Sequence, residues 1–521
     1  MKNASHSGKD LGNLFLAVLD DYGIKSKLFC ITTDNASNNG SMAEYIEKVA
    51  EKDPSFSFNK EENMISCFAH VINLVCHNLI EKGLKARAPN DSANMEAVMK
   101  DIDKNGSEND NPIDRLRKGC GKIKLSNQLT CVFEANKKML KLPDLAIILD
   151  CSTRWNSTKN MIDRFLAVKE AYKLTINSDD DARKNCSLND EQIQYITIVN
   201  EVLSKFEKIT VWLSSQQYTT INKTIVLFNR LFDQLDAFQE SNPHLAEAIE
   251  CCKDKLSKYY SKTDLTSVYA NSTLVDPGLK FSYWKDQKWE QNIINGQIAV
   301  CKASFSSFLK NYYAKELDEN NSTAVICRAI HRNEAGPSML ANMDIDSSDS
   351  IYSTSEDEDI VGSSLSKLQD ERHTKVQLIE GNDEIIKHYV ETNADLKKYL
   401  DIDHRIEYKS KLKLRKSKLQ NDDDGDDEIE HEDEVAMTNM ELGKKYATLP
   451  LKFWKQHENL FPTLSLFARK HLSIPATSVP AERLFSQAKY IINGTRAKLH
   501  PDTGEKIVLL TRWQNELFIK A

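Results

Sequence analysis

Apolar residues recur along most of the chain at the three- and four-residue spacing that is typical of an amphipathic α-helix. This spacing predicts helices over residues 11–19, 43–50, 67–82, 114–140 and 155–172, and again over residues 464–472 and 504–518. Between about residue 190 and residue 313 the pattern is that of long helices, and no convincing strand interrupts them. The middle of the chain is therefore expected to be all-helical.

Two short stretches favour β-structure instead. "KSKLFCITT" (residues 25–33) combines Leu28, Phe29 and Ile31 with threonines, which are residues enriched in strands. The apolar run 145–149 is a possible second strand. A stable sheet generally needs three or more strands, so the α/β part at the start of the chain is expected to be incomplete.

Polar segments separate the periodic ones. Residues 89–111 predict a mobile insertion. Residues 343–365 are acidic, rich in serine and poor in large apolar groups, so they cannot offset the entropy of ordering. They are expected to be a disordered linker, whose serines are alternatively phosphorylation sites. Residues 409–419 are basic and residues 422–434 acidic; the basic run is either a nuclear-localisation or phosphate-contacting patch, or a partner of its acidic neighbour.

Composition narrows the function classes only a little. The 521 residues carry a formal net charge of -8, but the acidic runs are segregated, so nucleic acid is not excluded as a partner. No apolar run approaches the roughly 18 residues that a membrane span needs. Eleven cysteines without a CxxC pair fit reduced thiols in a cytosolic or nuclear protein. Cys67 and His70 lie within an apolar helical pattern, which favours core packing there, and no zinc site is expected.

Three positions are candidates for chemistry. Asp34 follows the first predicted strand, where open α/β sheets place their ligands, although an acid there can also cap the next helix. Glu482 falls in the first turn of a helix that Pro480 is suited to open, where the helix dipole favours an acid in any case. Trp155 stands beside Arg154; it is either a core residue or an exposed ring that stacks on an unpaired base.

Six blocks of the sequence, taken in order, resemble the hAT superfamily of cut-and-paste DNA transposases. The resemblance spans nearly the whole chain and departs from the family pattern only after Glu482, where the family usually has a glycine in place of Lys489 or Tyr490. The blocks are "HSGKDLGNLF" (6–15), "ITTDNASNN" (31–39), "CFAHVINLV" (67–75), "TRWNST" (153–158), "LVDPGLKF" (274–281) and "FPTLSLFARKHLSIPATSVPAERLFS" (461–486).

The resemblance implies a fold and a site. The family has an RNase H-like core interrupted by a long helical insertion, and three carboxylates of that core hold two divalent ions, normally Mg²⁺. Asp34 matches the second carboxylate and Glu482 the third. Trp155, with Arg154 next to it, matches the aromatic residue that supports the DNA flank, and the Cys67–His70 pair is expected to be structural or near the DNA.

The expected fold class is an incomplete α/β RNase H-like core with a large all-α insertion, mostly helical overall and with disordered acidic inserts. The expected divisions are a partial core (1–175), the helical insertion (176–316), an acidic linker (317–380), a further helix of the insertion (381–402), a basic and acidic linker (403–437) and the C-terminal dimerisation region that completes the core (438–521).

The family's first carboxylate precedes its "HSG"-like block by several dozen residues, whereas this sequence begins five residues before His6. The acids at Asp10, Asp20 and Asp21 lie on or beside the first predicted helix and cannot replace it. A BED-type zinc finger is absent from the sequence as well. The chain as written is therefore expected not to cut or join DNA. Mg²⁺ is expected as a cofactor only if the catalytic core is complete.

The resulting expectation is a nuclear, transposase-derived protein that binds DNA, with transposon ends as the expected target, and associates with itself, without membrane association. Self-association is expected to use apolar residues of the C-terminal region, which alternatively pack within the chain: Phe467, Leu472, Leu484 and Phe485. Two alternatives stay open. One is an active transposase whose N-terminal part is lost from the gene model, and the other is a nuclear scaffold or transcription regulator that pairs through its C-terminal helices.

Overall fold

The structure, a computed structural model, describes residues 7–86, 111–151, 154–216, 218–320 and 449–491, together with isolated positions at 396, 399, 500, 503–504 and 506–510. The predicted insertion at 89–111, apart from its last residue, and the linker 403–437 lie outside the described residues. Of the linker predicted over 317–380, the first four residues are described, and they continue a helix. Within the helix predicted over 381–402, Leu396 and Tyr399 are described, and both are helical.

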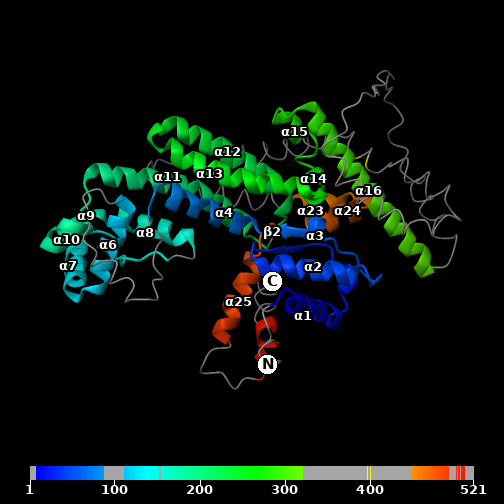
Figure 1. The fold of residues 1–521 in the computed structure, drawn as a ribbon, viewed down its shortest axis with the longest axis horizontal. Helices are drawn as coiled ribbons and strands as arrows, with labels where there is room; N and C mark the ends of the chain where they lie inside the picture. The colour runs from blue at the N-terminus through cyan, green and yellow to red at the C-terminus, as the bar shows by residue number, and fades with distance from the viewer. Residues whose placement is uncertain are drawn as a thin grey trace, which may run out of the picture. The chain divides into compact units, whose positions relative to one another are not determined.

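The chain divides into two compact units, each assembled from separate stretches of the sequence. The first unit comprises Met1–Thr273, Ile429–Thr448 and Leu472–Ala521, and the second comprises Leu274–Glu428 and Leu449–His471. The predicted insertion 176–316 is thus shared between them. Segments far apart in the sequence complete each unit, as the colours of Figure 1 show for the first, in which the orange helix α25 belongs with blue elements.

The first unit begins with a small α/β motif. Helix α1 (Gly8–Asp21) is followed by the 3-10 turn η1 (Lys25–Lys27), strand β1 (Ile31–Thr33), helix α2 (Ser37–Ala50), helix α3 (Lys60–Asn63) and strand β2 (Met64–Ser66). The strands pair in parallel, with Ile31 opposite Met64 and Thr33 opposite Ser66. Glycine lets α1 approach α2 closely, because a Cβ at Gly12 would lie 2.6 Å from the Tyr45 ring.

The observed sheet corrects the predicted one. The first strand is shorter than predicted, since Lys25–Lys27 form a 3-10 turn. Residues 145–149 do not form a strand, and the second strand, Met64–Ser66, escaped the sequence analysis because three residues are too few to show alternation. Two strands are all that the described residues contain, so the RNase H-like core remains a prediction.

Helices make up the rest of the first unit, and α12 and α13 pack side by side (Figure 1). The predicted helix over 114–140 is two helices, because Ser126 is extended and its Oγ caps the second by accepting the Leu129 N–H. The elements are α4 (Phe68–His77), η2 (Asn78–Gly83), α6 (Pro112–Leu125), α7 (Asn127–Met139), α8 (Trp155–Ala167), α9 (Lys169–Asn177), α10 (Asp180–Cys186), α11 (Asp190–Leu213), η3 (Ile221–Lys223), α12 (Thr224–Ser241), η4 (Pro243–Leu245), α13 (Ala246–Tyr260), η5 (Ser261–Leu265), α14 (Ser267–Leu274) and α25 (Val479–Ile491).

The second unit is held by aromatic residues. Its helices are α15 (Ser282–Asp286), α16 (Gln291–Asn320), α23 (Leu449–Gln456) and α24 (Pro462–Leu472). The rings of Phe305 and Phe467 meet edge to face at 5.3 Å, and the Trp454 indole N–H donates to the Val275 carbonyl at 2.7 Å. Aromatic pairs of this kind add roughly 0.5–1.5 kcal/mol to the gain from burial.

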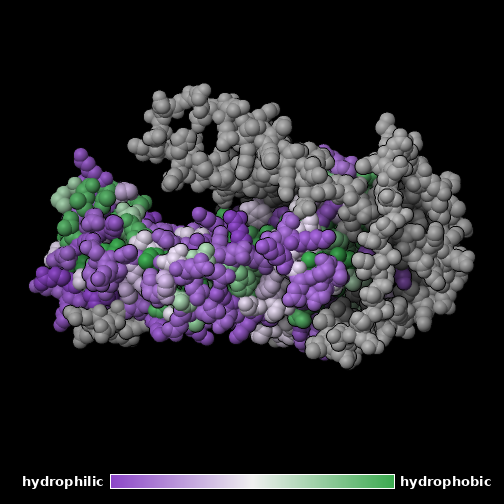
Figure 2. All heavy atoms as spheres, turned by 90° about the horizontal axis from the view of Figure 1, so that it is seen from above, coloured by the Kyte–Doolittle hydropathy of each residue, from purple (hydrophilic) through white to green (hydrophobic). Residues whose placement is uncertain are grey.

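Hydrophilic side chains dominate the described surface in the space-filling view, where apolar side chains form scattered patches (Figure 2). No helix in the described part of the chain is both long enough and apolar enough to cross a membrane.

Burial of His471 predicts that acid destabilises the protein. Burial lowers the pKa of His471 from 6.5 to about 3, and its Nδ1–H donates to the Phe467 carbonyl at 2.9 Å. Between these two pH values the unfolded chain binds a proton that the folded chain does not, so the free energy of unfolding decreases as the pH falls below 6.5. We expect this residue to contribute a loss of about 1.4 kcal/mol per pH unit in urea unfolding.

His471→Phe should remove that part of the pH dependence. His457→Phe is the matched control, because His457 is half-buried and makes a similar bond to the Phe453 carbonyl. Equal pH profiles for the two variants would contradict the assignment to His471.

Candidate functional site

A segment from the end of the chain closes over the carboxyl ends of the two strands. The Thr32 hydroxyl donates to the Pro475 carbonyl at 2.8 Å, and the Phe68 N–H donates to the Ala476 carbonyl at 2.9 Å. The Ser478 N–H in turn donates to the sulfur of Cys67 at 3.3 Å. Residues separated by more than 400 positions in the sequence therefore meet where β1 and β2 end.

Ala476 of this segment and Arg483 of α25 are also fastened to the chain at and after the end of α11. The Ala476 N–H donates to the Thr220 hydroxyl at 3.0 Å, and the Arg483 guanidinium donates to the Ser214 carbonyl at 2.8 Å. A cation at the last carbonyls of a helix also interacts favourably with the helix dipole. The start of α25 is thus held from two sides, which fixes the position of its first turn.

Asp34 organises the turn between β1 and α2. Its Oδ1 accepts the Ala36 N–H at 3.1 Å and the Asn39 amide at 2.6 Å. Among the described residues, none donates a hydrogen bond to its other carboxylate oxygen. The carboxylate therefore stabilises the turn but does not cap α2, whose N-cap is Ala36 without a side-chain cap bond, so the helix-capping alternative is wrong. The second carboxylate oxygen of Asp34 stays available to another partner.

Glu482 lies in the first turn of α25, as the sequence predicts, and is exposed. Its Oε1 accepts a hydrogen bond from the Ser478 hydroxyl at 3.2 Å. A short chain of contacts connects it to the strand that precedes Asp34, because the Cys67 N–H donates to the Thr33 carbonyl at 2.7 Å and the Cys67 sulfur accepts from Ser478. The junction brings the segments that carry Asp34 and Glu482 together.

Trp155 requires a correction. Its side chain is 3% exposed and meets the Phe206 ring edge to face at 6.5 Å, while its backbone N–H donates to the side-chain oxygen of Asn73 on α4. A ring buried to this extent offers no face to a base, so the expectation of an exposed stacking residue is wrong for this structure. Arg154 is exposed, and His70 is half-buried on α4, one turn after Cys67.

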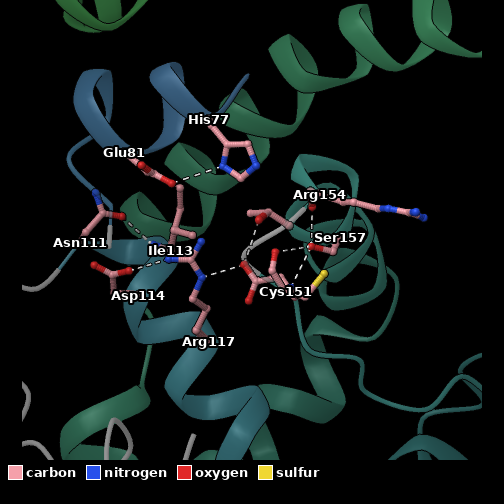
Figure 3. A network of polar contacts seen from close by, with 11 residues as sticks. His77, Glu81, Asn111, Ile113, Asp114, Arg117, Cys151, Arg154 and Ser157 are labelled. Carbon is pink, nitrogen blue, oxygen red and sulfur yellow. Dashed lines mark hydrogen bonds and ion pairs between the residues drawn. The ribbon is translucent and has the colours of Figure 1, made fainter. Parts of the chain in front are cut away.

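A buried ionic network, which sequence analysis missed, holds the segment before Trp155. Arg117 of α6 donates to Asp150 at 2.7 Å and to Asp114 at 2.8 Å, and the Thr158 hydroxyl donates to Asp150 at 2.9 Å. The Cys151 N–H donates a further bond to the Ser157 hydroxyl. The side chain of Arg154 extends away from this network (Figure 3). The position of Asp150 after an apolar run is the one available signal, and it does not identify the partner.

The four residues predicted at the dimer interface fall into two classes. Phe467 is 1% exposed and packs against Phe305 and Phe308, and Leu472 is 2% exposed. These two pack within the chain, which was the alternative considered for them. On α25, Leu484 is half-buried and Phe485 is 71% exposed, so an intermolecular role stays a prediction for this pair.

Metal binding at the site stays a prediction as well. Asp34 and Glu482 supply oxygen ligands of the kind that Mg²⁺ prefers. Within the described residues, no group of three or more His, Cys, Asp and Glu side chains is arranged to hold a metal ion. Asp34 and Glu482 therefore have the ligand chemistry that a divalent ion needs. They are two carboxylates, however, and the resemblance implies three.

Comparison with known families identifies three matching segments. Residues 1–57 match the model described as ZBED1 RNase-like domain, and residues 65–202 match the ZBED1 RNase-like helical domain. Residues 433–514 match the hAT family C-terminal dimerisation region. The junction described above thus joins parts of the chain that match different models.

Curated relatives include both transposases and regulators. A protein of Talaromyces stipitatus named as a candidate transcriptional regulator is 23% identical over 97% of this chain and 48% of its own length. A Zea mays protein named as a candidate AC transposase is 24% identical over 53% of this chain and 31% of its own length. Human zinc finger BED domain-containing protein 4 is 20% identical over 53% of this chain and 20% of its own length. The chain spans about half the length, or less, of these relatives.

Removing one acid of the buried network should destabilise the first unit. Asp150→Ala leaves the buried Arg117 guanidinium with one fewer counter-charge, and we expect a loss of about 3 kcal/mol in the free energy of unfolding, measured with urea. Asp180→Ala, which breaks an exposed pair with Arg183, is the control and should cost less than about 1 kcal/mol. Similar losses in the two variants would show that the network does not hold this segment.

Proposed function

Because the chain belongs to the hAT superfamily of transposase-related proteins, we propose that it binds DNA and associates with itself through its C-terminal region. The observation that carries this proposal is the junction at the carboxyl ends of β1 and β2. There the segment of the dimerisation-region match that begins α25 is hydrogen-bonded to the strand ends. Self-association and the candidate DNA site would thus share one piece of the chain.

For the site around Asp34 and Glu482 we propose DNA binding and no catalysis. When bound, a pair of divalent ions supplies activation of a nucleophile and stabilisation of the leaving oxygen in phosphodiester displacement. Asp34, through its second carboxylate oxygen, and the exposed Glu482 would be the ligands of this chain. Since the described residues contain two such carboxylates near the junction, we derive no catalytic step and propose DNA association as the activity.

One observation favours a second candidate function, that of a nuclear transcription regulator. The relative named as a candidate transcriptional regulator matches 97% of the chain, whereas the relative named as a candidate AC transposase matches 53%. Regulation through DNA binding and pairing requires no cleavage. The two candidates differ in one measurable property, the ability to cut a DNA strand.

DNA association predicts a steep dependence on salt. The full chain should bind a labelled duplex of random sequence, with an affinity that decreases as salt is raised because the protein displaces counterions from phosphates. Fluorescence anisotropy between about 50 and 200 mM salt measures this. Absence of binding at low salt would contradict the proposal. Cleavage in Mg²⁺ or Mn²⁺ that Asp34→Ala abolishes would establish the active transposase instead.

Self-association should depend on Phe485. A ring that is 71% exposed on α25 is available to a second copy, and Phe485→Asp should weaken dimerisation of the full chain at least about tenfold, measured by light scattering over a concentration series. Met139→Asp is the matched control, because Met139 is 65% exposed on α7, outside the dimerisation-region match. A wild-type chain that stays monomeric at tens of micromolar would contradict pairing.

A further inference from the structure

A patch of basic and aromatic side chains at the end of α13 borders the turn that carries Asp34. Lys255, Tyr259 and Lys262 follow one another at helical spacing along α13 and the 3-10 turn η5. The Lys255 ammonium lies 5.9 Å from the centre of the Tyr259 ring, and the Lys262 ammonium lies 5.0 Å from it. The side chain of Tyr259 neighbours that of Asn35, the residue after Asp34. The patch therefore adjoins the candidate site.

The acids next to the patch in the sequence, Asp254 and Asp264, both within the described residues, form no ion pair with its lysines. Neither Lys255 nor Lys262, nor the exposed Lys258 between them, forms an ion pair with any residue that the structure describes. Lys253 on the same helix shows the contrast, since Asp236 and Glu250 hold its ammonium at 2.8 and 2.9 Å. An anion beside the ring would meet both ammonium groups.

The scaffold beneath the patch is firmly held. The face of α13 that adjoins the patch is buried through Ala248, Cys252 and Leu256, and the Tyr260 ring lies 5.3 Å from the Phe228 ring. The turn after α13 is tied to the strand β2 region, because the Thr266 hydroxyl donates to the Glu62 carbonyl at 2.7 Å and the Glu62 carboxylate accepts the Ser267 N–H at 3.0 Å. The patch thus keeps its place relative to Asn35 and Asp34.

Helix polarity explains only part of the pattern. Lysine in the last turn of a helix is favoured by the helix dipole, and this accounts for Lys258. Lys262 lies beyond the end of α13, and Lys255 lies more than one turn before that end. Their shared feature is the Tyr259 ring, which points to a common ligand.

We propose that Lys255, Tyr259 and Lys262 contact the phosphodiester backbone of DNA and hold it beside Asp34. The inference rests on the proposed DNA-binding function and names the surface that performs it. A carboxylate by itself repels a phosphate, so a backbone that passes Asp34 needs positive charge next to that acid. Lysines supply such contacts without reading sequence, and the tyrosine ring adds a surface against which a sugar or base can pack. DNA is favoured over RNA because the patch adjoins the proposed DNA site.

The test compares two double variants of the full chain. Lys255→Gln with Lys262→Gln should reduce the slope of log affinity against log salt by about 1 to 2 on a random DNA duplex, because each lysine that contacts a phosphate adds about one to the slope. Lys169→Gln with Lys208→Gln removes the same charge from exposed positions of α9 and α11 and should leave the slope nearly unchanged. Thermal unfolding followed by circular dichroism verifies that both variants fold.

Equal slopes for the two double variants would overturn the patch and leave DNA binding by the protein intact. A wild-type chain that binds no DNA would overturn both the patch and the proposed function. Tighter binding of a duplex RNA of the same length, with the same dependence on Lys255 and Lys262, would overturn the assignment to DNA.

Discussion

The first unit depends on the hydrogen bonds that fasten residues 475–478 to the carboxyl ends of β1 and β2. A parallel pair of three-residue strands is marginal by itself, since sheets generally need more strands or a covering layer. The Pro475 and Ala476 carbonyls accept from Thr32 and Phe68, and such bonds contribute roughly 1 kcal/mol each, less where the pair is exposed to water as it is at Pro475. Without this segment, the polar groups at the strand ends would lose their partners.

The same junction decides what the site can be. Glu482 and the residue before Asp34 are connected through Ser478 and Cys67, so the long separation of the two acids along the chain is no obstacle to a shared role. Asp34 already serves the turn before α2 through one oxygen. A structural role and a ligand role for one carboxylate are therefore compatible, although the structural role of Asp34 lies in the turn and not at the N-cap of α2, which is Ala36.

Charge is distributed unevenly around this junction. Buried charges such as Arg117 are paired with acids at short distance, as expected from the cost of leaving a charge unpaired away from water. Lysines beside Tyr259 lack such partners within the described residues, although an acid-rich chain of net charge -8 has carboxylates to spare. That contrast, more than the overall charge, indicates where an anionic partner would bind.

The sequence by itself determined the helices of the middle of the chain, the strand that leads into Asp34, the helix start at Glu482 and the family. Each of these follows from local periodicity, from a turn signal or from short motifs, which do not depend on distant residues. Tertiary structure alone decided that Met64–Ser66 is the second strand, that Trp155 is buried while Phe485 is exposed, and that Tyr259 neighbours Asn35 in the turn of Asp34. Burial and proximity depend on which distant segments pack together, and no local pattern contains that information.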